Sequence, residues 1–146
     1  METTERTSIK LETKINAPVN KVWRAWTEPA IILKWFGSDP NGKGLKAELD
    51  VLPGGHYEIT FCNADGAEHT CSGVYDDVQE CGRLSFSWEW KSEPGVISHV
   101  TVVLAPEGDA TLMNFTHANV WTASSHNYLQ GWQDTFRKLE RALNAP

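Results

Sequence analysis

The sequence predicts an α+β protein in which a curved antiparallel sheet of about seven strands wraps around one long C-terminal helix. Three observations support this class. One alternating segment opens the chain, a series of alternating segments separated by turn residues fills its middle, and a long amphipathic segment closes it. The 146 residues suit one domain, which we expect at residues 7–143, between a flexible N-terminus at 1–6 and a C-terminal tail at 144–146.

The first elements are predicted to be one strand followed by two short helices. Residues Ser8–Ile15 alternate apolar and mostly charged side chains, which is typical of a half-buried strand. A proline at position 18 and another at position 29 are each typical of the first turn of a helix. The second helix is expected to cover about residues 29–34. The first helix has an apolar stripe made of Val19, Val22, Trp23 and Trp26.

The middle of the chain is predicted to form six further antiparallel strands. In the first of them, Leu45 and Ala47 fall on the inward face. In the last, Phe115 and His117 fall on that face. The alternating segments cover about residues 45–51, 57–61, 68–78, 84–90, 96–105 and 111–120.

The turn at residues 63–66, Asn-Ala-Asp-Gly, decides which side chains of the first hairpin face inward. This order suits a type I turn with a bulge and a left-handed Gly66, which pairs residue 61 with 69 and residue 59 with 71. A two-residue turn would shift the register by one and gather Cys62, His69 and Cys71 outside as ligands for a soft metal. We favour the first register. It places on one inner face Tyr57, Ile59, Phe61, His69, Cys71 and Tyr75.

The C-terminal segment has the clearest helical pattern in the chain. Ser124 or Ser125 is its predicted N-cap. Gly131 costs such a helix about 1 kcal/mol relative to alanine, so we predict that it lets the helix approach the sheet closely. A sheet wrapped around this helix leaves a cavity of the kind that binds small molecules. Apolar residues recur every third or fourth position at Leu129, Trp132, Phe136, Leu139 and Leu143.

Composition and motifs exclude several classes of function. Lysine and arginine number 13 against 19 acidic residues, and the net charge of −6 argues against nucleic acid as a partner. No apolar run approaches the roughly 20 residues of a membrane span and no signal peptide is recognised, so we expect a cytoplasmic protein without membrane insertion. Three cysteines without a CxxC motif argue against a disulfide framework. In the absence of a known catalytic or nucleotide-binding motif, we expect no metal or organic cofactor.

The seven tryptophans supply much flat apolar surface for a chain of this length. Trp23 and Trp26 are predicted to pack in the core, whereas the other rings can line a cavity or contact the sheet. We therefore predict that the protein binds a small hydrophobic or aromatic molecule. The predicted ligand-binding residues are Trp35, Tyr57, Ile59, Phe61, His69, Tyr75, Trp88, Trp90, His117, Trp121, His126 and Trp132.

Short motifs along nearly the whole chain resemble a known superfamily. Residues 15–27 open with the pattern I-x-A-P-x-x-x-V-W-x-A-W-T. Further motifs are Trp35-Phe36-Gly37, Pro53-Gly54-Gly55-His56-Tyr57, Gly73-Val74-Tyr75 and Gly131-Trp132. In this order they resemble the START-like, Bet v 1-like (SRPBCC) superfamily, and within it the branch named for the heat-shock protein 90 ATPase activator homologue.

The resemblance implies the helix-grip fold and leaves other functions open besides ligand binding. One alternative is a chaperone-associated stress-response protein of the activator type. Another is a cavity enzyme, such as a cyclase or hydrolase, acting through His69 or His117; whether the chain is an enzyme stays open. Because the edge strands of such a sheet can pair between subunits, a homodimer is also an expectation.

Overall fold

The protein is described here by a computed structural model that covers residues 6–122 and 125–144, without the side chains of residues 125 and 126. The expectations for residues 1–5, for a cap at Ser124 and for residues 145–146 therefore lie outside the described residues. The elements are β1 (Arg6–Ile15), α1 (Val19–Thr27), α2 (Pro29–Ile32), β2 (Lys43–Leu49), β3 (His56–Cys62), β4 (Glu68–Gln79), β5 (Arg83–Trp90), β6 (Ile97–Glu107), β7 (Ala110–Trp121) and α3 (Ser125–Asn144).

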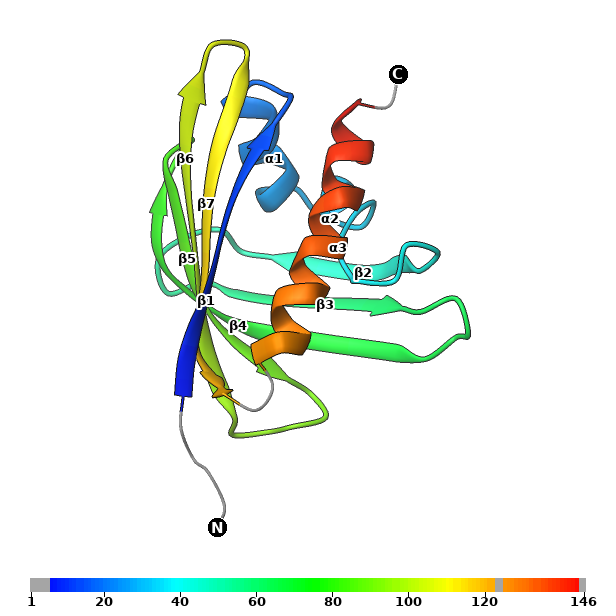
Figure 1. Ribbon diagram of the computed structural model, residues 1–146. Coiled ribbons are helices and arrows are strands. Elements are labelled where there is room, and N and C mark those ends of the chain that lie inside the picture. The colour runs from blue at the N-terminus through cyan, green and yellow to red at the C-terminus, as the bar shows by residue number, and fades with distance from the viewer. Residues whose placement is uncertain (1–5, 123–124, 145–146) are drawn as a thin grey trace.

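One antiparallel sheet of 7 strands, in the order β1-β7-β6-β5-β4-β3-β2, forms the body of the molecule. The sheet curves around α3, and α1 lies on the same side of the sheet as α3 (Figure 1). This is the predicted α+β helix-grip architecture, which is thereby confirmed. None of the described helices is long and apolar enough to cross a membrane.

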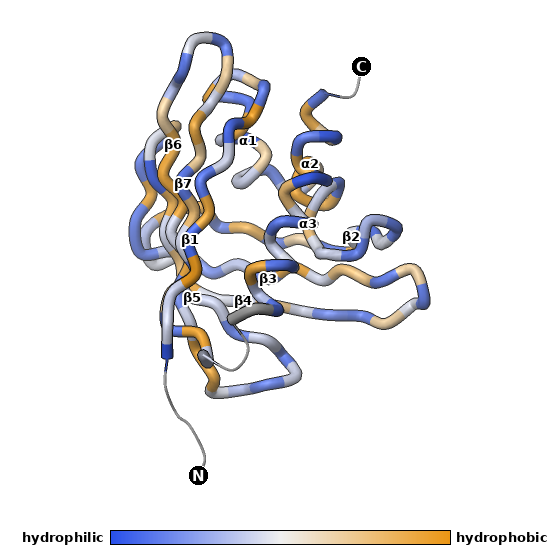
Figure 2. Tube along the Cα trace, in the orientation of Figure 1, coloured by the Kyte–Doolittle hydropathy of each residue, from blue (hydrophilic) through white to orange (hydrophobic). Residues whose placement is uncertain are grey.

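The core between the sheet and the helices contains a cluster of aromatic rings among aliphatic side chains. Trp26 lies at its centre, with its ring centroid 4.8 Å from that of Trp35 and 6.4 Å from that of Phe115. Trp23 and Trp26 are both buried, as predicted from the stripe of the first helix. Hydrophobic and hydrophilic residues alternate along the strands (Figure 2), so that one face of the sheet packs against these rings and the other faces solvent.

The β3–β4 hairpin has the register that the turn sequence favours. Phe61 pairs with His69 and Ile59 with Cys71, and Gly66 is left-handed with φ of 90°. Because neighbouring residues of a strand point to opposite faces, this register separates Cys62 from His69 and Cys71. No group of three or more His, Cys, Asp and Glu side chains that could hold a metal ion is found in the described part of the chain.

The start of β2 differs from the prediction. Its register with β3 shifts between Gly44 and Lys46, so Leu45, expected on the inward face, is 43% exposed. Gly44 takes the inward position opposite Phe61 and donates its N–H to the carbonyl of Leu33 over 3.2 Å. A Cβ on Gly44 would lie 2.5 Å from that oxygen, which leaves room for glycine alone and moves the leucine outward.

Candidate functional site

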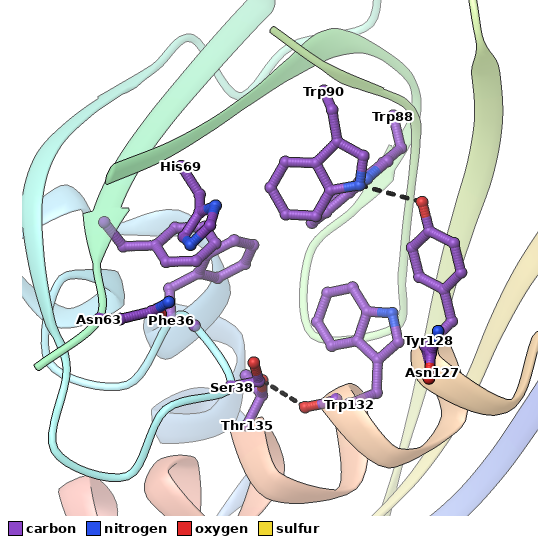
Figure 3. A pocket seen from close by; sticks show the side chains of 13 residues that line it. Phe36, Ser38, Asn63, His69, Trp88, Trp90, Asn127, Tyr128, Trp132 and Thr135 are labelled. Atoms are coloured by element: carbon purple, nitrogen blue, oxygen red, sulfur yellow. Dashed lines mark hydrogen bonds between the residues drawn. The ribbon is translucent and has the colours of Figure 1, made fainter. Parts of the chain in front are cut away.

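A cavity of about 400 Å³ lies between the sheet and α3, in the size range of small-molecule sites (Figure 3). Four parts of the chain form its walls: the segment after α2, the β3–β4 hairpin, the end of β5 and the first half of α3. The lining residues are Phe36, Gly37, Ser38, Phe61, Asn63, His69, Trp88, Trp90, Asn127, Tyr128, Gly131, Trp132 and Thr135.

The inner wall of the cavity is aromatic. Phe36, Phe61 and Trp88 are buried there, and the ring of Phe36 lies 5.7 Å from that of Phe61 and 5.9 Å from that of Trp88. Trp132 of α3 packs on Trp88 with 5.3 Å between ring centroids. Edge-on and tilted contacts of this kind stabilise aromatic rings against one another.

The rim of the cavity is polar, because the side chains there come from exposed ends of elements. Ser38 and Asn127 are exposed, whereas Asn63 and His69 are half-buried. In Figure 3, Asn63 and His69 lie on the side opposite Asn127. The cavity thus has an apolar interior and a rim that can form hydrogen bonds, which is a common arrangement for binding organic molecules.

A hydrogen bond between Trp90 and Tyr128 joins β5 to α3 beside the cavity (Figure 3). The indole N–H of Trp90 donates to the hydroxyl oxygen of Tyr128 over 3.0 Å. Burial raises the pKa of Tyr128, although the hydrogen bond from Trp90 acts in the opposite direction. The phenol therefore keeps its proton at neutral pH.

Behind the cavity, His117 holds Trp132 in place. The Nε1–H of Trp132 donates to Nδ1 of His117 over 3.0 Å, and Nε2 of His117 lies 2.7 Å from the hydroxyl of Ser98. Since Nδ1 accepts, the proton of the neutral ring is on Nε2, which donates to Ser98. Burial lowers the pKa of His117 to about 3. This fully buried neutral imidazole is therefore a positioning residue for Trp132.

Asp39 joins the segments that form the rim. Its carboxylate accepts the backbone N–H of Ala64 over 2.8 Å and that of Asn41 over 2.9 Å. These hydrogen bonds hold the pKa of Asp39 below its ordinary value. The ammonium of Lys138, a buried residue of α3, donates to the carbonyl oxygen of Asp39 over 2.9 Å. One residue therefore connects α3, the segment after α2 and the β3–β4 hairpin.

The cavity brings together only part of the predicted set. Of the predicted ligand-binding residues, those that line the cavity are Phe61, His69, Trp88, Trp90 and Trp132. Tyr57, Ile59 and Tyr75 do face inward, but they surround a separate void of about 10 Å³, which is too small for an organic ligand. His117 lies behind Trp132 with both ring nitrogens engaged.

The remaining predicted residues are placed elsewhere. Trp35, predicted as a ligand-binding residue, is fully buried, and its N–H donates to the carbonyl of Ala25 over 3.0 Å. Trp121 ends β7, where the guanidinium of Arg6 stacks 4.0 Å from the centre of its ring. Neither residue is among those that line the cavity. The side chain of His126 lies outside the described residues.

Sequence reasoning missed several lining residues, half of them on α3. Tyr128, Gly131 and Thr135 lie at helical spacing on the same face as Trp132. A search for apolar stripes does not detect them, because this part of the face is not apolar. Gly131 was expected to face the sheet. Its added Cβ would instead lie 3.7 Å from Cβ of Ser38, an ordinary contact, so the glycine widens the cavity rather than easing a close approach.

Comparison with known proteins agrees with this architecture. Residues 16–144 match the family described as activator of Hsp90 ATPase homolog 1-like protein. A search of curated proteins returns no match.

Three solved structures show the similarity. A protein of Rhizobium leguminosarum is 28% identical, with 97% of each chain covered and a TM-score of 0.83. One from Chromobacterium violaceum is 24% identical, with 95% of this chain and 98% of that chain covered and a TM-score of 0.84. An AHSA1-like protein of Aeromonas hydrophila is 24% identical over 94% of this chain and 92% of its own, with a TM-score of 0.81.

Proposed function

The chain belongs to the family of activator of Hsp90 ATPase homolog 1-like proteins, and from this premise we propose that it binds a small hydrophobic or aromatic molecule. The cavity between the sheet and α3 carries the proposal. Its volume of about 400 Å³ fits an organic molecule of modest size, and its inner wall consists of aromatic rings. Burial of apolar ligand surface contributes roughly 25 cal/mol per Å², and stacking on these rings adds to that.

The proposal is tested with prodan (6-propionyl-2-dimethylaminonaphthalene), a neutral naphthalene ketone whose emission shifts to the blue in apolar surroundings. We expect the wild-type protein to bind it saturably. Gly131→Leu should remove most of the blue shift, because a side chain added at this position extends from the bare backbone into the cavity. Isothermal calorimetry with the same compound gives the stoichiometry.

Gln133→Leu is the matched control, since residue 133 lies on the exposed face of the same helix and takes the same side chain. It should bind prodan like the wild type. Circular dichroism and urea unfolding show whether both variants are folded. Equal binding by Gly131→Leu and Gln133→Leu would place the dye outside the cavity and contradict the proposal.

A second candidate function is association with a chaperone, which the match to an activator family favours. It predicts that the protein changes the ATPase rate of heat-shock protein 90 at equimolar concentration. The same pair of variants separates the two functions. If Gly131→Leu changes the ATPase rate as the wild type does while losing prodan, the chaperone is bound through a surface and not through the cavity.

A further inference from the structure

The hydroxyl of Tyr128 is a hydrogen-bond donor without a partner among the described residues at the cavity. Tyr128 accepts the N–H of Trp90, and no described residue accepts its own hydroxyl proton. The Trp90 N–H occupies one side of the Tyr128 oxygen, so the proton is directed elsewhere, and Tyr128 lines the cavity. In Figure 3 this oxygen lies at the top of the Tyr128 ring, between β5 and α3.

Trp88, which also lines the cavity, is 3% exposed, and its indole N–H has no hydrogen-bond partner among the described residues. That N–H is already buried in the free protein, so the hydroxyl of Tyr128 is the donor from which we argue. The other hydroxyl of the inner helix face, on Thr135, is already engaged, because it donates to the carbonyl of Gly131 over 2.7 Å.

Groups that would compete for these donors are scarce at the cavity. Its described lining contains no aspartate or glutamate, and the interior around Tyr128 and Trp88 is formed by aromatic carbon. A saturated hydrocarbon ligand would bury the Tyr128 hydroxyl without compensation. A ligand that offers an oxygen or a ring nitrogen there would accept its proton.

Resting on the proposed function, we propose that the ligand is an aromatic molecule that carries a hydrogen-bond acceptor, such as a ketone oxygen, and that Tyr128 donates to this acceptor. Trp90 acts as the positioning residue, since its N–H fixes the orientation of the Tyr128 hydroxyl. The aromatic inner wall determines size and flatness, whereas Tyr128 determines the polarity of one edge of the ligand.

The test compares two naphthalenes of similar shape, 2-acetylnaphthalene and 2-ethylnaphthalene, of which the first has a carbonyl acceptor. The binding affinity of each compound is expressed relative to its solution in cyclohexane, which removes the difference in their solubility in water. On this scale we expect the wild type to bind the ketone about three- to tenfold more tightly. Tyr128→Phe should abolish this preference. Tyr75→Phe is the matched control, because Tyr75 is buried beside the small void and does not line the cavity, and it should keep the preference.

An infrared measurement keeps the proposal testable should Tyr128→Phe fail to fold. In the wild-type complex the carbonyl stretch of 2-acetylnaphthalene should move to lower frequency than in cyclohexane, as it does when a hydroxyl donates to it. An unshifted stretch, an absent preference in the wild type, or a preference that survives Tyr128→Phe would each overturn the role of Tyr128 while leaving ligand binding intact. Binding of neither naphthalene would instead contradict the proposed function itself.

Discussion

His117 is a neutral imidazole in the core, where burial lowers its pKa from 6.5 to about 3. Below pH 6.5 the unfolded chain binds a proton on this residue, whereas the folded chain does so only near pH 3. The contribution to stability is therefore complete above pH 6.5 and decreases as the pH falls toward 3, by about 1.4 kcal/mol per pH unit. Urea unfolding at several pH values within this interval measures the slope.

His117→Gln provides the comparison, because glutamine can accept from Trp132 and donate to Ser98 but does not titrate. The free energy of unfolding of this variant should depend less steeply on pH. The difference in slope should reach up to about 1.4 kcal/mol per pH unit, which corresponds to one bound proton. Identical slopes for the two proteins would contradict the neutral, buried state of His117.

At the scale of the residue, the sequence shows that aromatic side chains are abundant but not which of them meet. Trp88, Trp90 and Trp132 were predicted to line a cavity and do so. Trp35 was predicted to bind the ligand too, yet its ring is buried in the core and its N–H donates to a carbonyl of α1. This contact joins α1 to the segment after α2, and the pattern of residues within either segment does not show how the two are placed relative to each other.

At the scale of the element, α3 contains a glycine that its own packing does not require. Gly131→Ala should raise the free energy of unfolding by about 1 kcal/mol, because alanine favours the helix and its Cβ makes only an ordinary contact with Ser38. Urea unfolding of the variant checks this value. A loss of stability would mean that the segment after α2 lies closer to α3 than the structure shows.

Gly44 should behave in the opposite way. In Gly44→Ala the new Cβ would lie 2.5 Å from the carbonyl oxygen of Leu33, so β2 or the end of α2 has to move. We expect the free energy of unfolding to fall by about 1–3 kcal/mol, measured under the same conditions as Gly131→Ala. Unchanged stability would contradict the close contact between α2 and β2.

The two hairpin strands at this edge of the sheet show what local sequence can predict. The β3–β4 register follows from four turn residues and was predicted correctly, because turn chemistry fixes the pairing of the strands that flank it. The register shift at the start of β2 was not predicted. It depends on a contact between Gly44 and Leu33, which are on different elements, and the alternation of β2 alone favours an inward Leu45.

At the scale of the whole molecule, the fold could be predicted because strand number, strand order and one amphipathic helix leave few ways to bury their apolar faces. A cavity between the sheet and the C-terminal helix was expected as well, but the full set of residues that line it could not be predicted. It depends on where the segment after α2 meets α3, and that meeting is held by Asp39 and Lys138, which are 99 residues apart. Both are charged residues, which a sequence pattern assigns to the surface.

If the protein binds a ligand as proposed, Asp39 should affect the rates of binding. Its two hydrogen bonds, from the N–H groups of Ala64 and Asn41, should exist in the free and in the ligand-bound protein alike. They should therefore affect the energy barrier that a ligand crosses at the rim more than the binding equilibrium. Asp39→Ala should raise the association and dissociation rate constants of prodan in stopped-flow experiments while changing its Kd little. Asp65→Ala, which removes one bond within the hairpin turn, is the control. Rates equal to those of the wild type would contradict this role.

If the rates do separate from the affinity in this way, the protein has two independent controls over its ligand. The aromatic wall sets how much ligand is held at a given concentration, and the linked rim sets how long each molecule stays. A carrier that must deliver its cargo and a reservoir that must retain it could then differ in the rim alone, with the same interior and the same affinity.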